Sequence, residues 1–75
     1  MTDQEKDRIR KYLAMIRRKE ILNIEEARDF NRLISKLWKE HENSENLKHK
    51  SIIWDLTLLA GYVLGVARVR SKSNQ

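Results

Sequence analysis

The stretch LTLLAGYVLGVARV, residues 56–69, is the most apolar part of a 75-residue chain in which 36% of the residues are charged. It holds both glycines of the chain, Gly61 and Gly65, at the four-residue spacing that lets membrane helices approach closely. The stretch could be a membrane anchor, the core of a small helical domain, or a surface for another chain. The choice among these three decides the fold.

The uncharged part of this stretch is too short to predict a membrane span. Twelve residues separate Asp55 from Arg68, and they form about 18 Å of helix, whereas a hydrocarbon core is about 30 Å thick. A longer span would bury one of the two charges, at about 2.5–3.5 kcal/mol each. We therefore expect no membrane span. Because the N-terminus is charged and lacks a signal-peptide pattern, we also expect a cytoplasmic protein.

Composition predicts an all-α fold. The chain has no proline and only two glycines, and a β-rich fold of this length would need more of both in its turns. Cysteine is absent, so neither disulfides nor thiolate metal sites can support the fold. A single domain of this size is marginally stable by itself, and oligomerisation is the remaining means of stabilising it.

Two capping boxes predict where the first two helices begin. In a capping box, the N-cap residue and the residue three positions later satisfy each other's free backbone N–H groups. The pairs with this spacing are Thr2 with Glu5 and Asn23 with Glu26.

A third helix begins at Ser51, or earlier if Ser44 caps a short lead-in. The helices are expected over about residues 3–19, 24–42 and 51–70. They form a single helical domain, residues 1–70, followed by a polar, disordered tail, residues 71–75.

Short connections favour antiparallel neighbours, so we expect an up-down-up three-helix bundle, or a helical hairpin with a central third helix. The third helix is apolar around most of its circumference, and two neighbours can cover only two of its sides. Because large exposed apolar patches mark interfaces, we expect a homodimer built on this helix. The expected interface residues are Leu56, Leu59, Gly61, Val63, Gly65 and Val66.

The two glycines have two interpretations at this stage. They either lower the stability of the helix, by about 0.8–1.0 kcal/mol each relative to alanine, or they let another helix approach closely. The sequence leaves both open.

No catalytic constellation is recognisable in the sequence. His41 lies between two glutamates and His49 between two lysines, and both are interpreted as solvated residues at helix ends. A phosphate-binding loop, a nucleophile elbow and metal-ligand spacing are all missing from the sequence. We therefore expect no enzyme activity, no catalytic or metal-ligating residues, no cofactor and no small-molecule substrate.

The basic residues suggest nucleic-acid binding as one function. The formal net charge is +5, and in an up-down-up bundle the first and third helices end at one pole, where their cations could contact phosphates. The competing interpretation is that these cations only stabilise helix C-termini. The residues concerned are Arg17, Arg18, Lys19, Arg68, Arg70 and Lys72.

The two tryptophans suggest protein binding instead. Trp38 and Trp54 lie at the edges of the apolar faces of the second and third helices, where they either anchor a partner or complete the core. We expect a non-enzymatic interaction protein that inhibits or regulates a macromolecular partner, a protein in preference to a nucleic acid. The alternative is a basic nucleic-acid-binding regulator, and the compact size would also fit a regulator from a phage or mobile element.

Overall fold

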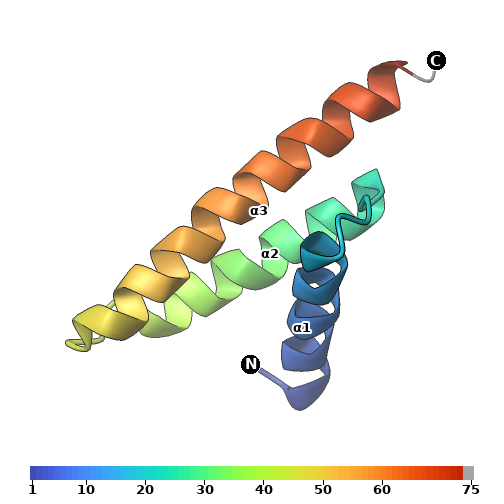
Figure 1. Ribbon diagram of the computed structural model, residues 1–75. Coiled ribbons are helices and arrows are strands. Elements are labelled where there is room, and N and C mark those ends of the chain that lie inside the picture. The colour runs from blue at the N-terminus through green and yellow to red at the C-terminus, as the bar shows by residue number, and fades with distance from the viewer. Residues whose placement is uncertain (74–75) are drawn as a thin grey trace.

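The computed structural model describes residues 1–73, and these residues form three α-helices and no strand. The helices are α1 (Asp3–Arg17), α2 (Ile24–His41) and α3 (Leu47–Ser73). Figure 1 shows α2 and α3 as an antiparallel pair joined by a short turn, with α1 crossing α2 obliquely. The prediction of an all-α, three-helix fold is confirmed.

Both predicted capping boxes are present. The Thr2 hydroxyl accepts a hydrogen bond from the Glu5 N–H at 3.2 Å, and the Glu5 carboxylate accepts one from the Thr2 N–H at 2.9 Å. Asn23 and Glu26 make the same pair of bonds at 2.8 and 3.0 Å. These helix starts are predictable because a capping box depends only on residues that are close in sequence.

The end of α1 is a Schellman motif, which closes the helix two residues before the predicted end. The Lys19 N–H donates to the Ile16 carbonyl at 3.0 Å, and the Glu20 N–H donates to the Met15 carbonyl at 2.9 Å. Lys19 has a φ of 59°, in the left-handed region. Glycine is the usual residue at this position because it lacks a Cβ.

The start of α3 lies four residues earlier than the predicted start at Ser51. Asn46 is the N-cap, and its side-chain oxygen accepts hydrogen bonds from the backbone N–H groups of Lys48 and His49 at 3.1 and 3.2 Å. Ser44 does not cap a separate lead-in; its hydroxyl accepts a hydrogen bond from the Asn46 N–H at 3.2 Å. The lead-in and the main helix are therefore one continuous element.

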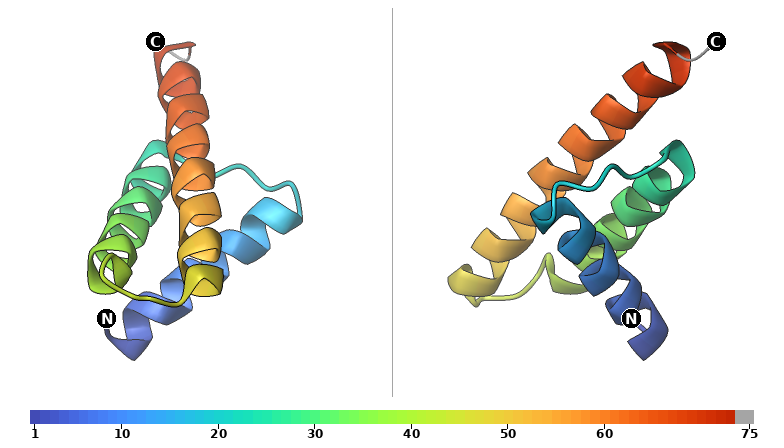
Figure 2. Two further views of the ribbon diagram at one scale, coloured as in Figure 1. Left: turned by 90° about the vertical axis from the view of Figure 1, so that its left-hand side faces the viewer. Right: turned by 45° about the vertical axis from the view of Figure 1, so that its right-hand side comes forward.

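The molecule is elongated, with extents of 45 × 21 × 19 Å, because α3 projects past the end of α2 (Figure 2). The helix continues to Ser73. The first three residues of the predicted tail are therefore helical, and residues 74–75 lie outside the described part of the chain.

The central helix of the fold is α2, and not the third helix as predicted. It packs against both α1 and α3, most extensively against α3, whereas within the described residues α1 and α3 make no close backbone contact. The core forms where the apolar face of α2 meets the other two helices. Its buried members are Ile9, Tyr12, Leu22, Ala27, Phe30, Leu33, Ile34, Ala60 and Ala67.

Polar contacts tie α1 to α2 at two places. The Tyr12 hydroxyl donates to the Asp29 carboxylate at 2.7 Å, and burial together with this bond raises the pKa of Tyr12 to about 12. Nearer the start of α1, the Lys36 ammonium donates to the Glu5 carboxylate at 2.9 Å. That hydrogen bond lowers the pKa of Glu5 to about 2.

Candidate interaction surface

Seven large apolar side chains of α3 are 38–79% exposed. We call these residues the outer face. They are exposed because α2 covers only one side of α3 and α1 does not pack along it. Exposed apolar side chains in this number make α3 a candidate interaction surface. The outer face consists of Leu47, Ile52, Trp54, Leu58, Tyr62, Val66 and Val69.

The buried side of α3 is a line of small or β-branched residues at steps of seven. Ile53, Ala60 and Ala67 are buried against α2, and Ala60 is 0% exposed. Alanine side chains let the axes of two helices come close. At about 100° per residue, Leu58, Tyr62 and Val69 lie within about 40° of one another on the side opposite Ala60.

The predicted interface residues divide between these two sides. Leu56, Leu59 and Val63 are half-buried against the chain's own core. Gly61, Gly65 and Val66 are exposed. The exposed surface available to another chain is therefore rotated around α3 relative to the predicted one.

The two glycines are not required by the packing of this chain. A Cβ added at Gly61 or Gly65 would meet nothing within 4 Å. Within the chain, the glycines therefore only weaken α3. The close approach of another helix at these glycines stays a prediction.

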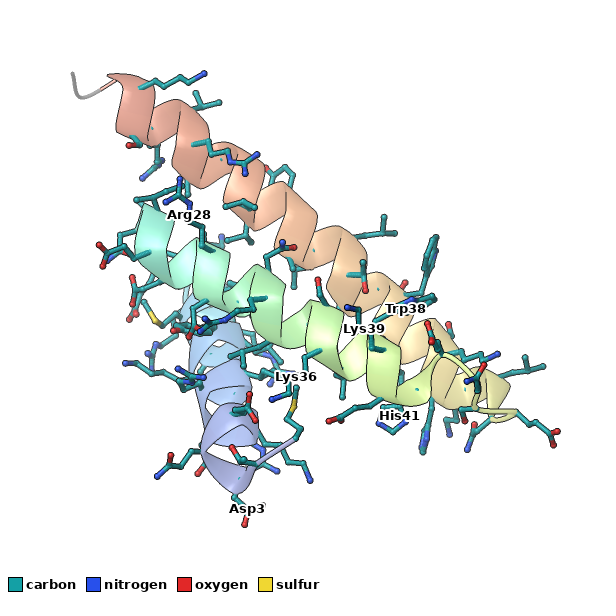
Figure 3. All side chains as sticks on the ribbon, turned by 180° about the vertical axis from the view of Figure 1, so that it is seen from behind. Asp3, Arg28, Lys36, Trp38, Lys39 and His41 are labelled. Atoms are coloured by element: carbon teal, nitrogen blue, oxygen red, sulfur yellow. The ribbon has the colours of Figure 1, made fainter. Side chains whose placement is uncertain are left out.

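The predicted partner anchors contact each other. The rings of Trp38 and Trp54 lie with their centroids 5.5 Å apart and tilted by 46°. Figure 3 shows Trp38 on the side of α2 that faces α3. Trp38 is half-buried while Trp54 is 54% exposed, so the pair joins α2 to α3 and leaves Trp54 on the edge of the outer face.

A groove of about 400 Å³ lies beside the outer face, between α3 and the linker that follows α1. We call it the linker groove. Its apolar lining includes Ile16, Ile21, Tyr62 and Val66.

The rim of the linker groove is charged. It carries Lys19, Glu20 and Arg70. Glu20 is paired with Arg18 at 3.0 Å, whereas Lys19 and Arg70 have no acidic partner among the described residues. The groove therefore combines apolar walls with two uncompensated positive charges.

The six cations predicted to share one pole are separated in the structure. Because α1 crosses α2 and does not run beside α3, the end of α1 reaches α3 only at the linker groove. Arg68 and Arg70, two residues apart on α3, point about 160° away from each other. The cations form three groups: Arg17 with Arg18 on the outside of α1, Lys19 with Arg70 at the groove, and Arg68 with Lys72 on the other side of α3.

The turn between α2 and α3 brings the two histidines together, which the sequence did not predict. The rings of His41 and His49 meet edge to face with centroids 6.5 Å apart. Within the described residues, no group of three or more His, Cys, Asp or Glu side chains could hold a metal ion. The contact depends on the exact geometry of the turn, which the predicted antiparallel order of the helices does not specify.

By length and composition, α3 can also cross a membrane over Leu47–Lys72, and only 17% of its most apolar window is buried. The expectation of no membrane span considered the twelve residues between Asp55 and Arg68, but α3 extends well past both charges. A bilayer and a protein surface are both suited to such a helix.

No protein-family model matches this chain, and neither a curated protein nor a solved structure is significantly similar to it.

Proposed function

We propose that this protein is a non-enzymatic helical interaction protein that binds and modulates a partner protein, and that it acts as a homodimer assembled through α3. The outer face carries this proposal, because it exposes seven large apolar side chains on a single helix. Burial of apolar surface contributes about 25 cal/mol per Å². Tyrosine and tryptophan, of which the outer face has one each, are enriched in protein interfaces.

The size of α3 supports a dimer. A stable interface buries about 800 Å² per partner, and this chain exposes 5807 Å² in total. A helix of 27 residues is about 40 Å long, and its outer face is apolar along most of that length. The exposed apolar side chains thus supply a surface of the length that a two-helix interface needs.

The linker groove supports a protein as the second partner. Its walls outside the outer face, Ile16 and Ile21, can bury aliphatic or aromatic side chains, while Lys19 and Arg70 can pair with carboxylates. A segment that carries apolar residues next to an aspartate or glutamate matches both features. We therefore assign the groove to such an acidic, apolar segment of the partner protein.

The separation of the cations gives less support to the nucleic-acid alternative. Phosphate binding is strongest where many cations act on neighbouring phosphates. Arg18 is paired with Glu20, and Arg68 points away from Arg70. The three groups of cations do not form a single basic surface.

Charge reversal at matched positions tests this proposal. Lys19→Glu/Arg70→Glu reverses the groove charges, while Arg17→Glu/Arg68→Glu makes the same charge change at exposed positions on the same two segments. We expect the wild type and the second pair to capture the same partner protein from an extract of the source cell, and the first pair to lose it. Circular dichroism checks that both variants fold.

Equal loss in both double variants would contradict the proposal, because it would show that general positive charge is what binds. An unchanged capture by the groove variant would contradict it as well. The nucleic-acid alternative makes its own prediction, namely retention of duplex DNA or RNA that falls about 10³-fold or more between 50 and 200 mM salt.

A further inference from the structure

We infer that the second copy binds antiparallel along the outer face of α3, so that Tyr62 of each chain packs on Gly65 of the other. This inference rests on the proposed homodimer and specifies its geometry. The two-fold axis then crosses α3 at the level midway between positions 63 and 64.

A regular seam runs along the exposed side of α3. Its positions alternate at steps of three and four, which is the spacing by which two helices pack side by side. The seam positions are Asp55, Leu58, Tyr62, Gly65, Val69 and Lys72, and all six are exposed.

The charges at the two ends of the seam decide between parallel and antiparallel packing. In a parallel, in-register pair each seam residue faces its own copy, so Asp55 would face the partner's Asp55 and Lys72 the partner's Lys72. In the antiparallel pair Asp55 faces the partner's Lys72, twice. Neither side chain has an ion-pair partner among the described residues. Like charges at an interface oppose binding, and opposite charges fix its register.

The shapes of the central residues agree with the same register. Tyr62 is 71% exposed, and a Cβ at Gly65 would meet nothing within 4 Å. In the antiparallel pair each tyrosine ring lies over the bare backbone of the partner's Gly65, and Leu58 faces the partner's Val69. A parallel pair would instead set two tyrosines against each other and leave a gap between two glycines. The antiparallel register therefore also gives Gly65 a role that the fold of one chain does not.

Disulfide cross-linking tests the direction of the helices. The chain has no cysteine, so Leu58→Cys and Val69→Cys each introduce a single thiol. We expect a mixture of the two variants to form mixed disulfide dimers on oxidation, and each variant alone to form few. A control, Lys11→Cys on the exposed side of α1, should not cross-link. Cross-linking of each seam variant with itself in place of the mixture would overturn the antiparallel inference while leaving a homodimer.

Charge exchange tests the register. Asp55→Lys and Lys72→Asp should each weaken the homodimer about tenfold or more, because each sets like charges against each other. An equimolar mixture of the two variants should dimerise again, since every lysine then faces an aspartate. Failure of the mixture to recover would overturn this register.

Substitution of the two glycines separates an effect on dimerisation from an effect on the stability of α3 itself. Gly65→Leu and Gly61→Leu both replace glycine with a better helix former in open space. Both should therefore raise the melting temperature of the monomer, measured at protein concentrations far below the dissociation constant of the homodimer. Only Gly65→Leu should weaken dimerisation, about tenfold or more, because it fills the site of the partner's tyrosine. An equal effect of both on dimerisation would overturn the proposed contact.

Flotation with vesicles of phosphatidylcholine and phosphatidylglycerol tests whether a bilayer, in place of a second copy, covers the outer face. We expect the wild-type protein to stay with the soluble fraction as a dimer. A monomer at all concentrations that floats with the vesicles would overturn both this inference and the proposed homodimer, and would assign the outer face to a bilayer. Self-cross-linked dimers that do not float would overturn the antiparallel geometry alone.

Discussion

Lys19 holds an unfavourable conformation at the groove that we propose as the binding site of a partner protein. Its φ of 59° lies in a region that non-glycine residues avoid, and its side chain stands at the rim of the linker groove. A glycine would end α1 with less strain but would remove a positive charge from the groove. The proposed binding of a carboxylate therefore gives a reason for a lysine at this position.

Lys19→Gly should stabilise the fold by about 1 kcal/mol, because glycine adopts the left-handed conformation without a Cβ penalty. Urea unfolding measures this change. The same variant should capture less of the partner protein than the wild type. A loss of stability would show that the lysine side chain contributes to the fold and not only to the groove.

Glu5 makes the fold sensitive to acid. Its pKa in the folded protein, about 2, lies below the ordinary value of 4.5, so folding favours the charged carboxylate. The stability that this provides is fully present above about pH 4.5 and is lost as the pH falls toward about 2. The wild type should exceed Glu5→Gln in urea midpoint at pH 7, and this difference should shrink steadily below pH 4.5. A difference that does not change with pH would contradict the Lys36 hydrogen bond as its cause.

Side-chain hydrogen bonds between residues that are close in sequence were predictable. The caps at Thr2 and Asn23 require only a partner three residues away, and both form as predicted. The hydrogen bond from Tyr12 to Asp29 joins two helices, and no local pattern in the sequence indicates it.

At the scale of the helix, α2 and α3 differ in how well their sequences define a buried side. The apolar residues of α2 follow a single stripe, and Ala27, Phe30, Leu33 and Ile34 are all buried. The apolar residues of α3 surround most of the helix, so their period does not indicate which side packs inward. In the structure the inward side carries Ile53, Ala60 and Ala67, and the small alanine side chains let α2 approach closely there.

Ala60→Leu should destabilise the protein by about 1–3 kcal/mol, because Ala60 is fully buried between α2 and α3 and a larger side chain overpacks that contact. Gly61→Ala, at the next residue, is the matched control. It should stabilise α3 by about 0.8–1.0 kcal/mol, since its new Cβ meets nothing within 4 Å. Thermal unfolding by circular dichroism measures both. An Ala60→Leu variant as stable as the wild type would mean that another side of α3 packs on α2.

At the scale of the whole molecule, the relative placement of α1 was not predictable. Short linkers suggested an up-down-up bundle, and that bundle would have gathered six cations at one end. In the structure α1 crosses α2 instead, where Ile9 and Tyr12 are buried. This placement divides the predicted basic pole and leaves most of α3 uncovered. The sequence predicted that the neighbouring helices would leave part of α3 exposed, but it did not indicate which side.

Sedimentation equilibrium at micromolar concentration tests the central claim, namely that a second copy covers the outer face of α3. The wild-type chain should sediment with twice its mass of 9.0 kDa, and Leu58→Glu, which places a charge at the centre of the outer face, should sediment as a folded monomer. A wild-type protein that remains a 9.0 kDa monomer up to the highest concentration measured would contradict the account.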